Sequence, residues 1–460
     1  MVLDIKKIEL KFIEAKEKAS KKNNQILFSI TNNIKISPNS LIDLNLDQYK
    51  EKVYWSQPFK KIEFITWGNV LDLNPNNNKS DVNREIQKMI FNKLECNLTK
   101  EKNIPVFIGG QNFDINKSNE NIWINFPRFN YQVPSILIFQ KNNITTITFN
   151  FIINDHLMFS TVSNRIEKYI EIIENYSSSI NKKTSSHFEL TKIKNDGKKF
   201  STSFSIIKDK INEEEIEKAI ISDIITYSFK GGFPINNLLL KLRKMYSECT
   251  IFLYDYPGKG KYLGASPEKI FSLENNNLEI DALAGSINRK NNKSDDISNT
   301  KLILQDKKIN KEHHIVVRGI IESLDKIGIE INNTKKSVLT LKNILHLKTL
   351  IKAKIISPNN PMDILDFLSP TPALSGYPKK KSMDIINTIE NHDRGWYSGA
   401  IGWVDNNLNS EFFAGLRSMF IDKNKLYIYA GAGITKDSNK NEEWDEILYK
   451  MDTIEELIHE

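Results

Sequence analysis

The most informative residues for the fold class of this chain are KIFSLENNNLEIDALAG, at positions 269–285. Two runs rich in apolar residues flank three consecutive asparagines, and asparagine tolerates the backbone conformations of tight turns. Two such runs with a short turn between them predict a β-hairpin, whose strands are antiparallel.

Other apolar runs extend this pattern along the chain and favour an α+β fold. Strands or strand pairs are expected at residues 61–70, 104–110, 134–140, 144–153, 249–256, 411–422 and 425–433. Helical periodicity predicts helices at about residues 4–22, 81–95, 161–180, 212–221, 236–246, 306–325, 381–390 and 441–458. The polar, aperiodic residues 181–200 are interpreted as the connection between two halves. Strands and helices do not alternate regularly, so a doubly wound parallel sheet is not expected.

The composition is that of a globular protein of substantial size. The chain has 460 residues, of which 40% are hydrophobic and 26% are charged, so a large core in one two-lobed unit or in two domains is expected. The net charge of +7 comes without a dense basic block, which argues against a nucleic-acid partner. No apolar run reaches the ~18 residues that a membrane-spanning helix needs.

Two further features predict a soluble, cytoplasmic protein. The N-terminal residues are rich in Lys and Glu, unlike a signal or transit peptide. Cys96 and Cys249 follow no metal-binding or redox spacing, and we expect them to be buried thiols in a reducing compartment. The sequence therefore predicts neither a membrane nor a nucleic-acid partner.

A carboxylate stands at the edge of the apolar face of the helix expected at residues 306–325. Val316, Ile320 and Leu324 repeat at helical spacing, and Glu312 lies one turn earlier on the same face. A carboxylate on a buried face is unfavourable unless it is paired or bound to a cation. A salt-bridged glutamate in the first turns and a cation ligand both fit this pattern.

The last expected helix repeats the arrangement. Glu443 lies in line with the apolar Ile447 and Met451, and Glu446 follows Glu443 by one turn. Two helices that each offer a carboxylate at the edge of a core match the few carboxylate ligands that Mg²⁺ prefers. One hypothesis from the periodicity is therefore a magnesium site between the two helices.

Two glycine-containing segments and one arginine are candidates for contact with an anion. Gly431 and Gly433 allow close approach of the backbone, and residues 283–286 offer backbone N–H groups. Both segments fit tight turns equally well. Arg417 is a lone cation in an apolar run, so its partner is either a structural carboxylate or an acidic substrate.

At these residues the sequence resembles the chorismate-utilising enzymes, and within them the isochorismate synthases. The resemblance is strong from about residue 214 to the C-terminus, and weaker in VYWSQP (53–58), PVFIGGQNFD (105–114) and WINFP (123–127). The most specific motifs are LGASPEKIF (263–271), ALAGSINR (282–289), KEHHIVV (311–317), LHLKT (345–349), SPTPALSGYP (369–378), DRGWYSGAIGWVD (393–405), GLRSMF (415–420), YAGAGIT (429–435) and EEWDEILYK (442–450). Any one of them can occur by chance, but the whole set in this order essentially cannot.

The resemblance implies an architecture. It implies a large, two-lobed α+β unit with two packed antiparallel sheets, helices on the outside and the active site in the cleft. Residues 1–195 are then expected to form a divergent N-terminal lobe, and residues 196–460 the chorismate-binding catalytic portion.

The resemblance also implies a reaction, the magnesium-dependent isomerisation of chorismate to isochorismate by addition of water at C2 and loss of the C4 hydroxyl. IEKAIISD (216–223) is similar to a KVVLSR-like motif, and it places Lys218 where isochorismate and salicylate synthases carry lysine and anthranilate synthases carry glutamine. Lys218 then matches the base that activates water, and Glu268 matches the acid that protonates the leaving hydroxyl. The product is expected to feed menaquinone or siderophore synthesis.

The implied binding residues follow motif by motif. The substrate contacts are Ser286, His346, Ala373, Leu374, Arg417, Gly431, Ala432 and Gly433. The ligands of Mg²⁺ are Glu312, Glu443 and Glu446. Chorismate is the expected small-molecule partner, and a monomer or weak homo-oligomer is expected.

Four positions depart from the family pattern. Asp223 stands where the family has arginine, Ile309 and Asn310 interrupt a KDREEH-like motif, and Ser369 replaces a histidine. None of the four is an implied catalytic residue. Two alternatives stay open, a salicylate synthase that also eliminates pyruvate and a chorismate-binding member with weakened catalysis.

Overall fold

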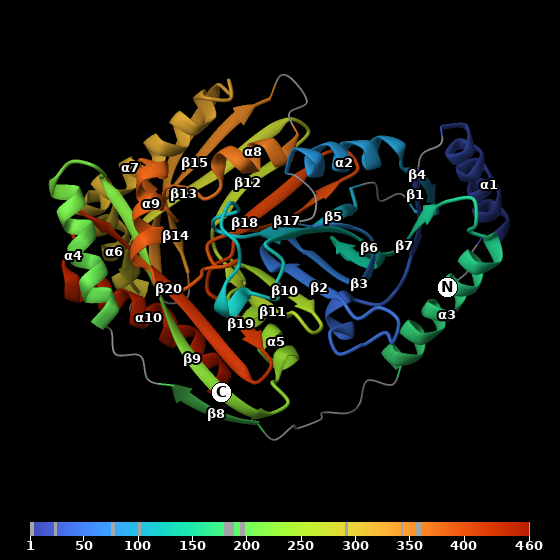
Figure 1. The fold of residues 1–460 in the computed structure, drawn as a ribbon, viewed down its shortest axis with the longest axis horizontal. Coiled ribbons are helices and arrows are strands. Elements are labelled where there is room, and N and C mark those ends of the chain that lie inside the picture. The colour runs from blue at the N-terminus through green and yellow to red at the C-terminus, as the bar shows by residue number, and fades with distance from the viewer. Residues whose placement is uncertain are drawn as a thin grey trace.

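The computed structural model describes residues 4–22, 25–74, 79–99, 103–178, 188–193, 198–289, 293–341, 344–355 and 360–459. Helices lie along the outside of a large, mostly antiparallel sheet (Figure 1). The α+β prediction is confirmed.

All of the described strands belong to one hydrogen-bonded sheet with two arms that meet at β6 (Phe129–Lys141). The first arm continues from β6 in order of pairing through β3 (Ile62–Leu73), β2 (Lys52–Gln57), β10 (Thr250–Tyr256), β11 (Gly260–Ser266), β19 (Ser418–Asp422), β20 (Lys425–Thr435), β9 (Lys218–Gly231) and β8 (Phe188–Ile193). A two-residue strand, β16 (Gly376–Tyr377), also pairs with the start of β9.

The second arm starts from the other edge of β6. It runs through β5 (Pro105–Gln111), β17 (Ala400–Asp405), β18 (Ser410–Ala414), β12 (Lys269–Glu274), β13 (Asn277–Asn288), β15 (Ile344–Lys354) and β14 (Ile331–Thr340). The same edge of β6 also pairs with β7 (Ile144–Ile153), which leads to β1 (Ile26–Asn33) and β4 (Leu94–Asn97). Among the described pairings, that of β1 with β4 is parallel.

The two arms pack against each other around an aromatic core. The rings of Trp55 on β2 and Phe413 on β18 have centroids 5.8 Å apart, and the Gln57 amide donates to Glu411 across the same junction at 2.7 Å. Residues of both arms share one buried cluster, including Phe252 and Ile401. The two expected layers are therefore present, but they are halves of one continuous sheet because β6 bonds to both arms.

Helices cover the outer faces of the two arms. Apolar residues of five helices pack into one buried cluster with the first arm, and those helices are α1 (Ile5–Lys22), α3 (Phe159–Ser178), α4 (Lys198–Asn212), α5 (Ile235–Met245) and α10 (Lys440–His459). Three helices pack with the second arm, namely α2 (Lys79–Asn92), α7 (Lys307–Asp325) and α8 (Pro361–Leu368). The remaining α-helices are α6 (Lys293–Gln305) and α9 (Lys379–Ile389).

Most of the predicted elements are present, and the hairpin at residues 269–285 is confirmed. Its turn contains Asn275 and Asn276, both with positive φ, which asparagine tolerates well. The helix predicted at 212–221 is wrong, because α4 ends at Asn212 and an isoleucine-rich run begins β9 at Lys218. β-Branched residues fit such a doubly paired strand better than a helix.

The predicted connection at residues 181–200 is only partly correct. Its described part contains β8 and the first residues of α4, whereas residues 181–187 and 194–197 lie outside the described residues. β8 is short and half polar, so its sequence carries little strand signal, and its place is set by pairing with the edge of β9.

Strands from the two predicted portions of the chain alternate in the sheet. β2 pairs with β10, and β5 pairs with β17, so residues before and after position 195 share both arms. The division into residues 1–195 and 196–460 stays a prediction. Cys96 and Cys249 are both buried and free. Within the part of the chain that the structure describes, no helix is long and apolar enough to span a bilayer.

Candidate active site

A cavity lies where β9, β13, β15 and β20 meet α7 and α10. It holds about 890 Å³ of empty space, part of which is open to solvent. The residues predicted for the site converge here from nine separate sequence motifs, and those that line the cavity are Lys218, Glu268, Ser286, Glu312, His346, Ala373, Leu374, Arg417, Gly431, Gly433 and Glu446. Two predicted residues, Ala432 and Glu443, do not line it.

Lys218 is the first residue of β9 and is almost fully buried. Its backbone is held on two sides, by pairing with Thr435 of β20 and with Tyr377 of β16. The hydroxyl of Ser382 also donates to its carbonyl oxygen at 2.9 Å. The ammonium nitrogen lies 2.9 Å from Oε1 of Glu312, so this lysine enters the cavity already paired with a carboxylate.

Glu268 lies in the two-residue link between β11 and β12, and it is 5% exposed. Burial raises the pKa of Glu268 to about 8, although the Lys218 ammonium and a hydrogen bond from Thr371 act in the opposite direction. The side chain is therefore neutral at pH 7 and can donate a proton to a bound molecule. A raised carboxyl pKa in a cavity is the property that a general acid requires.

One part of the cavity wall is suited to an anion. Arg417 and Lys450 both line it, and Lys450 donates to the carbonyl oxygen of Gly431 at 2.8 Å. Burial, together with the positive charges of Arg417 and Lys450, lowers the pKa of His346 to about 3, so the imidazole is neutral. Arg417 has a φ of 45°, a strained conformation for a non-glycine residue, in the short link between β18 and β19.

Gly433 and Gly431 are required by the space available. A Cβ on Gly433 would lie 2.9 Å from both Oε1 of Glu312 and Cε of Lys218, and one on Gly431 would lie 2.8 Å from a carbonyl oxygen of β9. Both glycines lie within β20 rather than in a turn, so the turn interpretation of this segment is wrong. Their small size lets the strand pass directly beside the charged side chains.

Ser286 follows a β-bulge in β13, where the register shifts between Leu283 and Ser286. Gly285 in this bulge has a φ of 78°, and a Cβ there would lie 2.5 Å from the side chain of Ile309. The buried His313 ring contacts the carbonyl oxygen of Ala284 at 3.3 Å, which ties the bulge to α7. The bulge aims the backbone of this segment at the cavity.

Ala373 and Leu374 belong to the segment between α8 and β16. The buried Arg394 holds this segment, donating to the carbonyl oxygens of Leu374 at 3.1 Å and of Ile220 on β9 at 2.8 Å. Its charge is neutralised by Glu390, with a nitrogen–oxygen distance of 2.6 Å. Arg394 thus couples two walls of the cavity without lining it.

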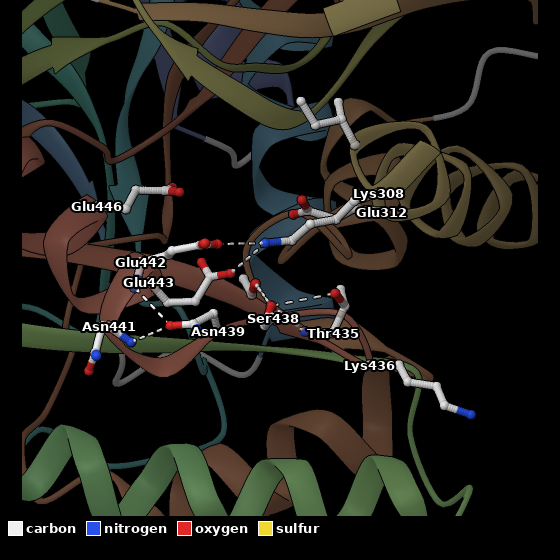
Figure 2. Close-up of polar contacts among 12 residues, drawn as sticks. Lys308, Glu312, Thr435, Lys436, Ser438, Asn439, Asn441, Glu442, Glu443 and Glu446 are labelled. Atoms are coloured by element: carbon white, nitrogen blue, oxygen red, sulfur yellow. Dashed lines mark hydrogen bonds and ion pairs between the residues drawn. The ribbon is translucent and has the colours of Figure 1, made fainter. Parts of the chain in front are cut away.

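The three carboxylates predicted as metal ligands are each paired with a lysine. Glu312 contacts Lys218, Glu446 contacts Lys450 at 2.6 Å, and Glu443 contacts Lys308 at 3.7 Å. Figure 2 shows Glu442, Glu443 and Glu446 projecting from the start of α10 toward α7, which carries Lys308 and Glu312. The backbone N–H of Glu443 donates to the carbonyl oxygen of Asn439 at 3.1 Å, and the Glu443 carboxyl is hydrogen-bonded to the side chain of Ser438. Both partners lie just before the start of α10.

These carboxylates suit a hard cation in their chemistry. Burial and repulsion by Glu446 and Glu312 raise the pKa of Glu443 to about 7, which shows that the three acids lie within electrostatic reach. Mg²⁺ is commonly held by one or two carboxylates plus water and substrate oxygens. In the described residues, no three acidic, histidine or cysteine side chains are already gathered at ligand distance, so the lysine pairs must open for a cation to bind.

The sequence analysis missed several residues that line the cavity, among them Lys450, Tyr397 and Tyr429. Lys450 follows Glu446 by one helical turn, so its place on the same face of α10 was readable from the sequence. The two tyrosines stack with centroids 5.0 Å apart, and their motif positions gave no sign that they reach the cavity.

The four departures from the family pattern lie outside the cavity lining. Asp223 accepts a hydrogen bond from the backbone N–H of Ile224. Burial lowers the pKa of His392, and the nearby Asp223 carboxylate acts in the opposite direction. Ile309 packs on Gly285, and Asn310 donates to the carbonyl oxygens of Leu304 and Asp306. Ser369 lies next to a cis proline.

The fold and this cavity define an enzyme that handles a small anionic substrate. A neutral carboxylic acid and a lysine share the space with an arginine, a second lysine and a carboxylate cluster. The chain belongs to the family of chorismate binding enzymes, because the sequence profile of that family matches residues 13–459.

Individual relatives agree with the family. Isochorismate synthase MenF of Bacillus subtilis is 27% identical over 452 residues, which cover 95% of each chain. The salicylate biosynthesis isochorismate synthase of Pseudomonas aeruginosa is 32% identical over 219 residues, which cover 47% of this chain and 46% of that protein.

Two solved structures share the fold. MenF, the menaquinone-specific isochorismate synthase from Escherichia coli, superposes with a TM-score of 0.75 at 20% identity, covering 97% of this chain and 100% of that one. Anthranilate synthase component I from Streptococcus pneumoniae superposes with a TM-score of 0.68 at 18% identity, covering 86% and 92%.

Proposed function

We propose that this protein is an isochorismate synthase that converts chorismate to isochorismate with the help of Mg²⁺. The observation that carries the proposal is Glu268, a buried carboxyl that stays protonated at pH 7 in the same cavity as Lys218. The relatives named isochorismate synthase support the same assignment.

The reaction requires one acid and one base. Lys218 acts as the neutral amine, after its ammonium has lost a proton, and accepts a proton from the water that forms the new C2–O bond while the ring double bonds shift. Glu268 gives its proton to the C4 hydroxyl, which leaves as water, because hydroxide alone is a poor leaving group. One water enters and one leaves, so the conversion is an isomerisation.

The remaining residues bind and orient the substrate. Arg417, with the backbone of Gly431 to Gly433, takes the enolpyruvyl carboxylate, and Lys450 adds a second positive charge beside it. The neutral His346 offers a hydrogen-bonding ring next to Ser286 on the neighbouring strand. Ala373 and Leu374 form an apolar wall against the substrate ring.

Glu312, Glu443 and Glu446 would hold Mg²⁺, which supplies positive charge for the ring carboxylate. Their acidic oxygens and their mutual repulsion support this assignment. We further propose that the enzyme acts in the cytoplasm as a monomer or weak homo-oligomer. Its product is proposed to supply menaquinone or siderophore synthesis, since the Escherichia coli structure is that of a menaquinone-specific isochorismate synthase and a relative from Vibrio cholerae is named vibriobactin-specific.

The test is incubation of the purified protein with chorismate, with and without Mg²⁺, followed by chromatographic separation of the products. Isochorismate formed only with Mg²⁺ is the expected result. Salicylate together with pyruvate would instead assign a salicylate synthase. Absence of turnover under both conditions would contradict the proposal and favour a chorismate-binding protein with lost catalysis.

A further inference from the structure

A lysine that takes no part in the proposed reaction lies in the carboxylate cluster between α7 and α10. Lys308 precedes Glu312 by one helical turn, and its ammonium points toward Glu442 and Glu443 (Figure 2). The nitrogen lies 3.3 Å from Oε2 of Glu442 and 3.7 Å from Oε1 of Glu443. The side chain is therefore a cation beside acids proposed to bind another cation.

The partners differ in how firmly they are placed. The Glu443 side chain is 8% exposed, whereas the Lys308 side chain is 39% exposed. A buried carboxylate needs a nearby positive charge, while a half-exposed lysine on a flexible stem can turn into solvent at little cost. The lysine is thus the partner that can leave.

We propose that Lys308 is the resident counter-ion of Glu443. The Lys308 ammonium competes with the divalent cation for this carboxylate and keeps the cation affinity of the site low. The inference rests on the proposed function, which assigns Glu312, Glu443 and Glu446 to Mg²⁺. In the absence of a divalent cation the ammonium offsets the charge of Glu443, and when the cation binds, the ammonium moves away. Release of the cation is correspondingly easier, because the lysine can return.

Lys308 differs from the other two lysines of the cluster in its position relative to the cavity. Lys218 and Lys450 line the cavity and have roles in the proposed reaction, whereas Lys308 does not line it. A substitution at position 308 therefore changes the charge around Glu443 without removing a group that contacts the substrate.

The test is a calorimetric titration of the full-length protein with Mg²⁺ in the absence of chorismate. Lys308→Met keeps the aliphatic stem and removes the charge, and it is expected to tighten Mg²⁺ binding about five- to tenfold. Lys308→Arg keeps the charge and is expected to bind as the unmodified protein does. The matched control is Lys311→Met, because Lys311 lies on the same helix but pairs with Asp437 at 3.0 Å and is 72% exposed.

Thermal unfolding gives a second readout that does not depend on turnover. Without Mg²⁺, Lys308→Met is expected to unfold at a lower temperature than the unmodified protein, since buried Glu443 loses its partner. The increase in unfolding temperature on addition of Mg²⁺ is expected to be larger in Lys308→Met than in the unmodified protein or Lys311→Met, because the affinity is higher.

Equal Mg²⁺ affinity in the unmodified protein, Lys308→Met and Lys311→Met would overturn the role of Lys308 while leaving the proposed metal site intact. An equal gain in both methionine variants would also overturn it, since that would be a general effect of charge. No binding by any of the proteins would remove the metal site of the proposed function and the competition with it.

Discussion

At the scale of single residues, the chemistry depends on the protonation of Glu268. The sequence motif places a glutamate here, but its neutral state arises from burial in the link between β11 and β12. An exposed glutamate would be ionised at pH 7 and unable to act as an acid. Lys218, which is paired with Glu312, lines the same cavity.

Replacing the acid tests this assignment. Glu268→Gln keeps the shape but cannot donate a proton, so kcat is expected to fall about 10²- to 10⁴-fold. The control is Glu63→Gln, since Glu63 is a buried carboxyl outside the cavity that pairs with Arg243. Product formation and the thermal unfolding temperature are measured for both. An active Glu268→Gln enzyme would rule out Glu268 as the acid.

The pH dependence has a defined sign. The pKa of Glu268 is raised from 4.5 to about 8, so kcat of the unmodified enzyme is expected to decline as the pH rises through about 8 and the acid is lost. Because protonation and folding are thermodynamically linked, the contribution of the Glu268 carboxyl to folding stability is complete below pH 4.5 and is lost as the pH rises through about 8. A pH–rate profile with no decline near 8 would contradict this assignment.

The base has its own test. Lys218→Ala is expected to lower the turnover rate about 10²- to 10⁴-fold or more, which is close to complete loss, because no other group then accepts the proton of the attacking water. Lys269→Ala is the matched control, since Lys269 lies on β12 next to Glu268 but pairs with Glu279. Circular dichroism checks that both variants fold. Turnover by Lys218→Ala close to that of the unmodified enzyme would exclude it as the base.

At the scale of elements, β9 and β20 build the floor of the site together. Lys218 and Gly433 lie two positions apart across this pair, in the register Lys218 with Thr435 and Ile220 with Gly433. Both elements continue beyond the site into the apolar cluster under α4 and α10. The rigid pairing holds the charged residues in place, and this explains why glycine is needed at position 433.

Gly433→Ala is expected to lower kcat about tenfold or more with little change in stability. The added Cβ meets Oε1 of Glu312 and Cε of Lys218, which are ends of flexible side chains that can shift, but their shift moves the base. Steady-state kinetics and urea unfolding separate the two effects. An unchanged kcat would show that the position of Lys218 is not critical.

The buried Arg394–Glu390 pair is expected to stabilise the contact between β9 and the segment with Leu374. Arg394→Met leaves the Glu390 charge buried and removes hydrogen bonds to two carbonyl oxygens, so it should cost about 3–5 kcal/mol of unfolding free energy. Arg318→Met, which breaks the exposed pair with Glu217, should cost about 0–1 kcal/mol. Urea unfolding measures both, and equal costs would contradict this account.

At the scale of the whole molecule, one sheet unites residues from both ends of the chain. β2 bonds to β10 and β5 bonds to β17, and the aromatic core between the arms draws on both portions. The cavity itself is built by residues after position 217, yet the strands that carry them are supported by the N-terminal strands.

A fragment of residues 196–460 is therefore expected not to fold by itself. Removing residues 1–195 would expose the bonding edges of β10 and β17 and uncover the buried Phe413 and Phe252. Expression of the fragment, with the full chain as control, should give aggregated or unfolded protein by circular dichroism and gel filtration. A soluble, cooperatively folded fragment would instead support the division at residue 195.

Local residue patterns were enough to predict most helices and strands and to name most of the chemical groups of the site. Asparagine turns and alternating apolar runs predicted the hairpins, and helical periodicity placed Glu312 and Glu443 at the edges of core faces. The motifs named eleven of the residues that line the cavity. These signals are local, because turns, periodicity and motifs each depend on residues close together in the chain.

How these residues come together, and in which protonation state, depends on the folded chain. It placed Lys218 on a strand rather than the predicted helix, because pairing with β20 outweighs local helix preference. It made Glu268 neutral through burial, and it paired each predicted metal ligand with a lysine, two of them from other elements. Burial and pairing depend on segments distant in sequence, so only the folded chain could set them.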